Sequence, residues 1–110
     1  MVFGLSTELL DTCVLAVLSK EDTYGYVLTQ NIKEVMDISE TTLYPILRKL
    51  QNKEFLTTYD KPYQGRNRRY YQITKLGKEK LSEYLEEWKN YKEKVDLILG
   101  GKKKWTEKNL

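Results

Sequence analysis

The sequence predicts a mainly α-helical fold with one small β-hairpin. Apolar residues recur at helical spacing in four segments, the pattern changes to alternation after Lys53, and 110 residues are the size of one domain. Hydrophobic residues make up 40% of the chain and charged residues 32%, which is typical of a globular protein. No apolar run reaches the roughly 18 residues of a membrane span, and the first ten residues lack a signal-peptide pattern. We therefore expect a cytoplasmic protein without a membrane partner.

Three helices are expected in the first half of the chain. The first covers about residues 7–19, and the second covers about residues 23–36. The third begins at Ser39 or at Thr42. The later start would place Pro45 in the first turn, where its missing N–H is tolerated.

The second half predicts a hairpin followed by a long helix. Residues 55–59 and 68–74 have the composition and alternation of strands, and residues 60–67 between them predict a long basic loop. A final helix follows over residues 75–99. Three helices followed by a two-stranded hairpin is the order of a winged helix-turn-helix, in which the third helix enters the major groove of DNA.

The final helix carries an apolar seam with the three-and-four spacing of a heptad repeat. One helix cannot bury such a seam against so small a body, so we predict a homodimer. The expected interface residues, with two from the start of the chain, are Leu5, Leu9, Leu81, Tyr84, Trp88, Tyr91, Val95 and Ile98. The chain then divides into a DNA-binding domain (1–74), a dimerisation helix (75–99) and a basic tail (100–110).

Two features of the composition argue against catalysis and metal binding. The chain has no histidine, which removes the commonest general base and metal ligand. Its single cysteine, Cys13, can form neither an intramolecular disulfide nor a thiolate zinc site, and it is surrounded by apolar residues. We expect no enzyme, no metal and no cofactor.

The charge is concentrated in the middle of the chain. Residues 39–80 contain four acids and ten bases, a net charge of +6, whereas residues 1–38 carry −4. All four arginines lie in the middle segment, and arginine suits phosphates and guanine edges. The segment is either a solvated basic surface or a face that binds double-stranded DNA.

The candidate DNA-binding residues come from the polar stripe of the third helix, from the hairpin and from the start of the second helix. Arg68 and Arg69 alternate in direction, so only one of them is expected to face DNA. The candidates are Tyr24, Thr41, Thr42, Tyr44, Arg48, Lys49, Gln51, Arg66 and Arg68. The alternative is a winged-helix module that binds another protein and not DNA.

Three stretches resemble the signatures of PadR-type transcriptional regulators: residues 23–27 (TYGYV), 42–50 (TLYPILRKL) and 65–77 (GRNRRYYQITKLG). The resemblance extends from about Leu9 to Leu99. One departure is Asn67, where the family commonly has proline at the tip of the wing. The resemblance implies a DNA-binding transcriptional regulator, and the single closing helix is similar to a small subgroup that includes repressors of multidrug transporters.

A ligand site is implied by the same subgroup. Its multidrug-binding members have a tryptophan at the position of Trp88. Either the two copies of Trp88 pack together in the dimer, or they line a slot for a planar aromatic or cationic effector. Asp11 and Thr12 are expected at the rim of that slot.

Overall fold

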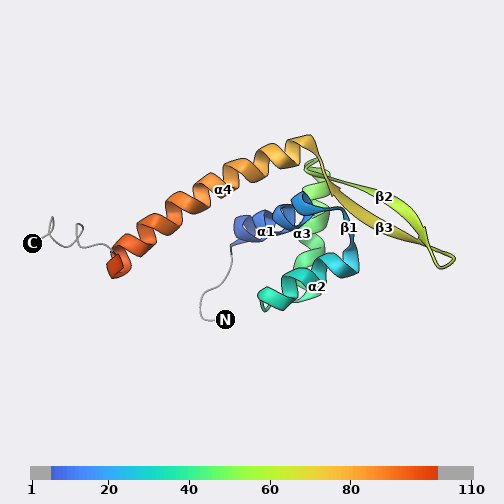
Figure 1. Ribbon diagram of the computed structural model, residues 1–110, viewed down its shortest axis with the longest axis horizontal. Helices are drawn as coiled ribbons and strands as arrows, with labels where there is room; N and C mark the ends of the chain where they lie inside the picture. The colour runs from blue at the N-terminus through green and yellow to red at the C-terminus, as the bar shows by residue number, and fades with distance from the viewer. Residues whose placement is uncertain (1–5, 102–110) are drawn as a thin grey trace, which may run out of the picture.

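The structure is a computed structural model, and it describes residues 6–101. Figure 1 shows a helical body from which a β-hairpin, the wing, projects at one end and a long helix at the other. In chain order the elements are α1 (Thr7–Lys20), β1 (Thr23–Tyr24), α2 (Gly25–Val35), α3 (Glu40–Asn52), β2 (Leu56–Tyr63), β3 (Arg66–Ile73), α4 (Lys75–Asp96) and a π-helical turn, η1 (Leu97–Gly101). The predicted fold class is therefore confirmed.

The hairpin belongs to a three-stranded antiparallel sheet with the order β1-β3-β2. The sequence did not predict β1, because a helix was expected to begin near residue 23. Instead, Thr23 pairs with Tyr71 and Tyr24 with Tyr70, so α2 begins only at Gly25. The start of α2 is thus attached to the centre of the sheet.

The wing is longer and its turn tighter than predicted. The two strands pair as far as Tyr63 and Arg66, so the prediction of a long loop over residues 60–67 is wrong. Only Gln64 and Gly65 lie between the strands, at φ of 49° and 79°, as a type I′ turn requires. Pro62 is accommodated because β2 is an edge strand.

The recognition helix of the predicted motif corresponds to α3. It begins at Glu40 with Ser39 in the capping position, which settles its ambiguous start in favour of the earlier one. Pro45 therefore lies inside the helix, on its exposed side. Its missing N–H is not in the buried half of the helix.

The core lies where α1, α2 and α3 meet the sheet and the first turns of α4. Leu81 is 7% exposed and belongs to this core, so its expected place in a dimer surface is corrected. Thr74 caps α4: its hydroxyl accepts a hydrogen bond from Gly77 N (2.9 Å) and donates one to the Glu54 carbonyl (2.7 Å). These contacts fix the origin of α4 on the α3–β2 connection.

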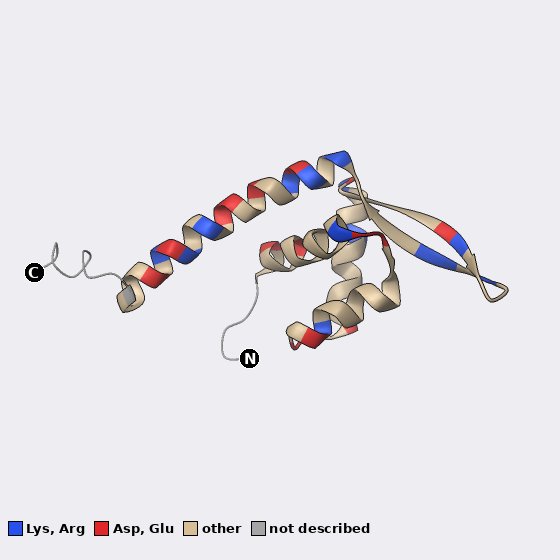
Figure 2. Cartoon of the chain, in the orientation of Figure 1, with Lys and Arg blue, Asp and Glu red and all other residues tan. Residues whose placement is uncertain are grey.

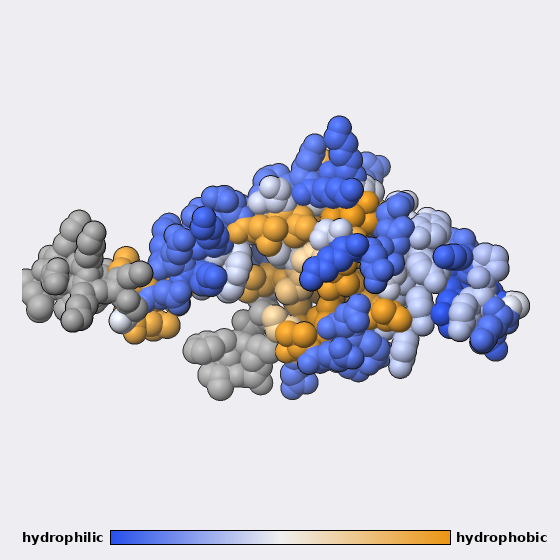
Figure 3. Space-filling model, in the orientation of Figure 1, coloured by the Kyte–Doolittle hydropathy of each residue, from blue (hydrophilic) through white to orange (hydrophobic). Residues whose placement is uncertain are grey.

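Beyond Tyr84, which packs against the core, α4 extends away from the body. The chain measures 68 × 29 × 20 Å, and its radius of gyration of 17.5 Å exceeds the value of about 13 Å for a compact domain of this size. The α-helix ends at Asp96, three residues before the predicted end at 99. Figure 3 shows apolar surface over the body and again where α4 ends, where Ile98 and Leu99 are exposed. Among the described helices, none is both long and apolar enough to cross a membrane.

Candidate nucleic-acid interface

The exposed face of α3 forms the centre of the candidate interface. Its polar stripe is exposed as predicted, and it comprises Thr41, Tyr44, Arg48 and Gln51. The leucines and isoleucine on the opposite side are buried. At the start of the helix, the Ser39 hydroxyl lies 2.8 Å from that of Thr41 and 3.1 Å from that of Thr42. A cluster of hydroxyl groups therefore marks the N-terminal end of the stripe.

One arginine of the wing shares this face of the molecule. Tyr71 of β3 and Tyr44 of α3 both approach Gly25, with ring atoms 3.5 and 4.0 Å from the position of an added Cβ. Burial raises the pKa of the Tyr71 hydroxyl, and the charges of Arg69 and Arg48 oppose that rise. Side chains two positions apart on a strand share a face, so Arg69 lies on the Tyr71 face of β3, the face where Tyr44 of α3 also approaches Gly25.

Sequence reasoning missed Arg69 as a candidate, although a signal was present. Side chains alternate along a strand, so Arg69 and Tyr71 share a face with Ile73. Ile73 is 8% exposed and faces the core, which identifies the side of β3 that also faces α3. Arg69 lies 3.8 Å from Asp60, but both side chains are largely exposed and such pairs are weak. Its charge thus remains accessible to a polyanion.

Arg68 lies on the opposite face of the sheet. Its guanidinium carbon lies 4.3 Å from the ring centre of Tyr24 and 3.5 Å from that of Tyr63. The arginine is held between β1 and β2 by these two rings, and stacking leaves its N–H edge free. Beside it is a concavity of about 620 Å³, lined by Tyr24, Tyr63, Gln64, Arg66, Asn67 and Arg68.

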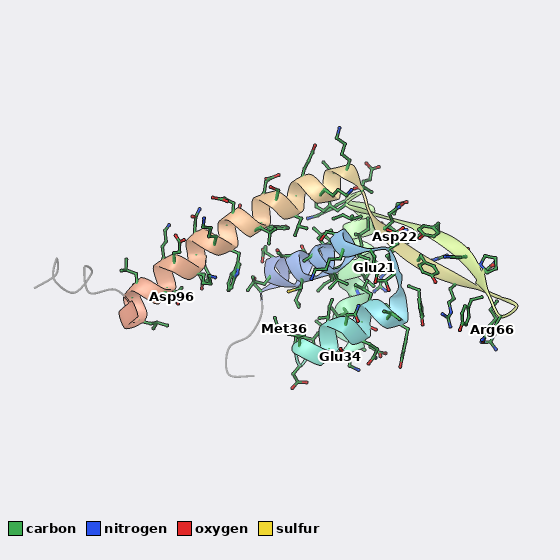
Figure 4. The ribbon with its side chains drawn as sticks, viewed as in Figure 1. Glu21, Asp22, Glu34, Met36, Arg66 and Asp96 are labelled. Carbon is green, nitrogen blue, oxygen red and sulfur yellow. The ribbon has the colours of Figure 1, made fainter. Side chains whose placement is uncertain are left out.

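Arg66 is at the tip of the wing, directly after the turn. Figure 4 places it at the far end of the hairpin from the body, and Figure 2 shows further basic residues along the wing. Within residues 6–101, neither Arg66 nor Arg48 forms an ion pair. Two arginines of the interface are therefore free to bind an anionic partner.

Lys49 does not share the outward stripe. Its Nζ lies 2.8 Å from Oδ1 of Asp11 on α1, and Asp11 is only 3% exposed. The pair links α1 to the flank of α3. Of the candidate DNA-binding residues on α3, Lys49 alone has its charge directed at another helix in the described structure.

A groove of about 490 Å³ separates α1 from α4. It is lined by Ser6, Glu8, Leu9, Thr12, Tyr84, Glu87, Trp88 and Tyr91. Of the two residues expected at the rim of a ligand slot, Thr12 lines this groove, whereas Asp11 is buried against Lys49 of α3. Consecutive helix residues point about 100° apart, and here Asp11 points towards Lys49 of α3 whereas Thr12 points into the groove. Its acidic side chains are Glu8 and Glu87, which sequence reasoning did not select.

The remaining seam of α4 is mostly uncovered. Trp88, Tyr91 and Ile98 are exposed, and Val95 is half-buried. Tyr84 is half-buried in the groove, where burial and then the nearby acids raise its pKa. Leu9 also lines the groove, and Leu5 lies outside the described residues. An apolar strip thus continues along α4 beyond the body.

The chain is similar to known proteins over most of its length. The family model described as "Transcriptional regulator PadR-like family" matches residues 14–83. An uncharacterized protein of Lysinibacillus sphaericus is 38% identical over 97 residues, covering 84% of this chain and 89% of that protein. A crystal structure from Streptococcus mutans UA159 is 42% identical, with a TM-score of 0.84, covering 92% of this chain and 95% of that one. A PadR-like transcriptional regulator of Bacillus cereus ATCC 14579 is 31% identical, with a TM-score of 0.78, covering 86% and 94%.

Proposed function

Because the chain belongs to the PadR-like family of transcriptional regulators, we propose that it is a homodimeric repressor that reads a palindromic operator and responds to a small-molecule effector. The observation that carries DNA binding is the meeting of α3 and the sheet at Gly25, with Arg48 in the exposed stripe of α3, Arg69 on the Tyr71 face of β3 and Arg66 at the tip of the wing. Members of the family are transcriptional regulators, which favours binding over catalysis.

In this proposal α3 enters the major groove and the wing follows the adjacent backbone. Arg48 reads a base edge, for which its planar fork is suited. Thr41, Thr42, Tyr44 and Gln51 provide the surrounding polar contacts. Arg66 and Arg69 bind phosphates, and on the outer face of the wing Arg68 and Tyr24 border the concavity that would accept another phosphate.

The dimer is proposed to form through α4, with residues 75–99 as the dimerisation unit and residues 1–74 as the DNA-binding unit. The support is the apolar strip that α4 carries away from the body, where Trp88, Tyr91 and Ile98 are exposed. A two-fold axis through this strip would set two copies of α3 about 34 Å apart, which fits half-sites one helical turn apart.

The effector site is proposed to be the groove between α1 and α4. Trp88 and Tyr91 provide aromatic faces, with ring centres 6.3 Å apart, and Glu8 and Glu87 provide negative charge. Aromatic faces and carboxylates together suit a planar cation. A ligand bound there would lie beside the proposed dimer helix.

The test is to enrich duplexes from a random pool with the wild-type chain and to measure affinities by fluorescence anisotropy. Arg48→Ala should cost about 1–3 kcal/mol and relax specificity, whereas Arg66→Ala should weaken all duplexes alike and lower the salt slope by about one. Lys89→Ala, which removes one charge from α4, is the control and should change neither. If the wild type binds no duplex at low salt, DNA binding is refuted and a protein-binding module becomes the better interpretation.

A further inference from the structure

A buried acidic residue of α1 forms an ion pair with the recognition helix, α3. Asp11, on α1, is the only buried acidic residue in the described part of the chain. Its Oδ1 is 2.8 Å from Nζ of Lys49, which makes the two an ion pair, and within residues 6–101 this oxygen accepts no hydrogen bond. A carboxylate removed from water requires a compensating charge, and Lys49 supplies it. The ion pair is therefore a fixed feature of the contact between α1 and α3.

The pair determines where the charge of Lys49 is placed. Lysine carries its ammonium on a flexible four-carbon stem and binds phosphate as a point charge. Lys49 follows Arg48, so its side chain leaves α3 about 100° around the axis from the outward stripe. Its side chain is still 33% exposed, so the stem is not enclosed. The attraction of Asp11 accordingly keeps the ammonium at α1.

We infer that Asp11 withholds Lys49 from DNA and so acts as a positioning residue that sets specificity, a role that rests on the proposed DNA-binding function. Contacts between lysine and phosphate are independent of sequence. A free lysine beside the outward stripe of α3 would strengthen binding to every duplex and reduce the advantage of the operator. The ion pair thus leaves recognition of the bases to those residues of α3 that face the major groove of DNA.

The test measures the salt dependence of binding for the full-length chain and for Asp11→Asn. The probes are a duplex enriched by the wild type and a random-sequence duplex of equal length. Asp11→Asn should steepen the plot of log affinity against log salt by about 0.9, the value for one added phosphate contact. When the salt concentration is lowered tenfold, the random-duplex affinity of Asp11→Asn should therefore rise about eightfold more than that of the wild type. The ratio of specific to random affinity should fall.

Three further variants isolate the role of the pair. Asp11→Asn/Lys49→Gln should return the slope to the wild-type value, because the released charge is gone. Lys49→Gln alone should leave the slope unchanged, and it retains a donor for Asp11 if Asp11→Asn folds poorly. Glu21→Gln, an exposed acid at the end of α1, makes the same charge change as Asp11→Asn and should have no effect on the slope.

Three results would overturn the inference. The first is a wild-type slope for Asp11→Asn, and the second is the same change in slope for Asp11→Asn and Glu21→Gln. The third is a slope that is lower by about 0.9 for Lys49→Gln, which would make Lys49 a phosphate contact in the wild type. A wild type that binds no duplex at low salt would instead refute the proposed function itself, and the inference with it.

Discussion

Gly77→Ala tests how closely α4 is joined to the rest of the fold. Gly77 is in the first turn of α4, directly over the connection between α3 and β2. A Cβ added at Gly77 would lie 2.1 Å from the carbonyl oxygen of Phe55 and 2.8 Å from Cγ1 of Ile73. Contacts between heavy atoms are favourable only near 3.5–4.0 Å, so the turn would have to move by about 1 Å or more.

Two opposing effects determine the size of the change. Alanine stabilises a helix by about 1 kcal/mol relative to glycine. Against this, overpacking costs about 1–3 kcal/mol. The shift would also stretch the hydrogen bonds from Thr74 N to the Phe55 carbonyl (3.0 Å) and from the Thr74 hydroxyl to the Glu54 carbonyl (2.7 Å). Each contributes about 0.5–1.5 kcal/mol, so we expect a net destabilisation of about 3 kcal/mol.

Urea unfolding followed by far-UV circular dichroism, at one fixed protein concentration, measures this loss. Lys78→Ala changes the exposed neighbour of Gly77 and should remain within about 0.5 kcal/mol of the wild type. If Gly77→Ala were as stable as the wild type, helix propensity would outweigh packing. The close contact between α4 and the α3–β2 connection would then be refuted.

Three other predictions concern the dimer, the groove and the outer face of the sheet. Val95→Asp should produce monomers in sedimentation velocity, because it buries a charge in the α4 strip; a tight dimer would place the interface elsewhere. Planar cationic dyes should quench the fluorescence of Trp88 in a Trp105→Phe variant, where Trp88 is the only tryptophan left, and unchanged emission at micromolar dye would exclude the groove. The hydrogen bond from Tyr59 to Asp22 raises the pKa of the Tyr59 phenol above its usual value of 10. The contribution of this hydrogen bond to stability is therefore complete below pH 10 and is lost as the pH rises through the raised pKa of Tyr59. Asp22→Asn should lower the pKa of Tyr59 in an ultraviolet titration, measured against Tyr59→Phe, and an unchanged titration would contradict this.

The helices could be predicted from the sequence because their signals are local. The buried stripe of α3 follows from the spacing of apolar residues within one or two turns of the helix. The sheet depends on longer-range pairing and was only partly predictable. The two residues of β1 are too short for a period, and their partners lie more than forty positions away. In the outer half of the wing both faces are mostly exposed, so residues 60–67 lack the alternation that identifies a strand.

For the candidate site, the sequence was a better guide to the types of residue involved than to the directions in which their side chains point. Sequence reasoning selected Asp11 and Thr12 together for the groove, yet their side chains leave α1 about 100° apart. Asp11 instead shares a helix face with Leu15 and Leu18, four and seven residues later, and both leucines are buried. That spacing is enough to predict a buried acid, and a buried acid requires a cationic partner. It cannot identify Lys49 among the available lysines, because the partner depends on how α1 crosses α3. In the structure, α1 directs Glu8 and Thr12 into the groove with α4 and directs Asp11 towards the recognition helix, α3. The helix that borders the proposed effector site is thus also the one that holds Lys49 in place.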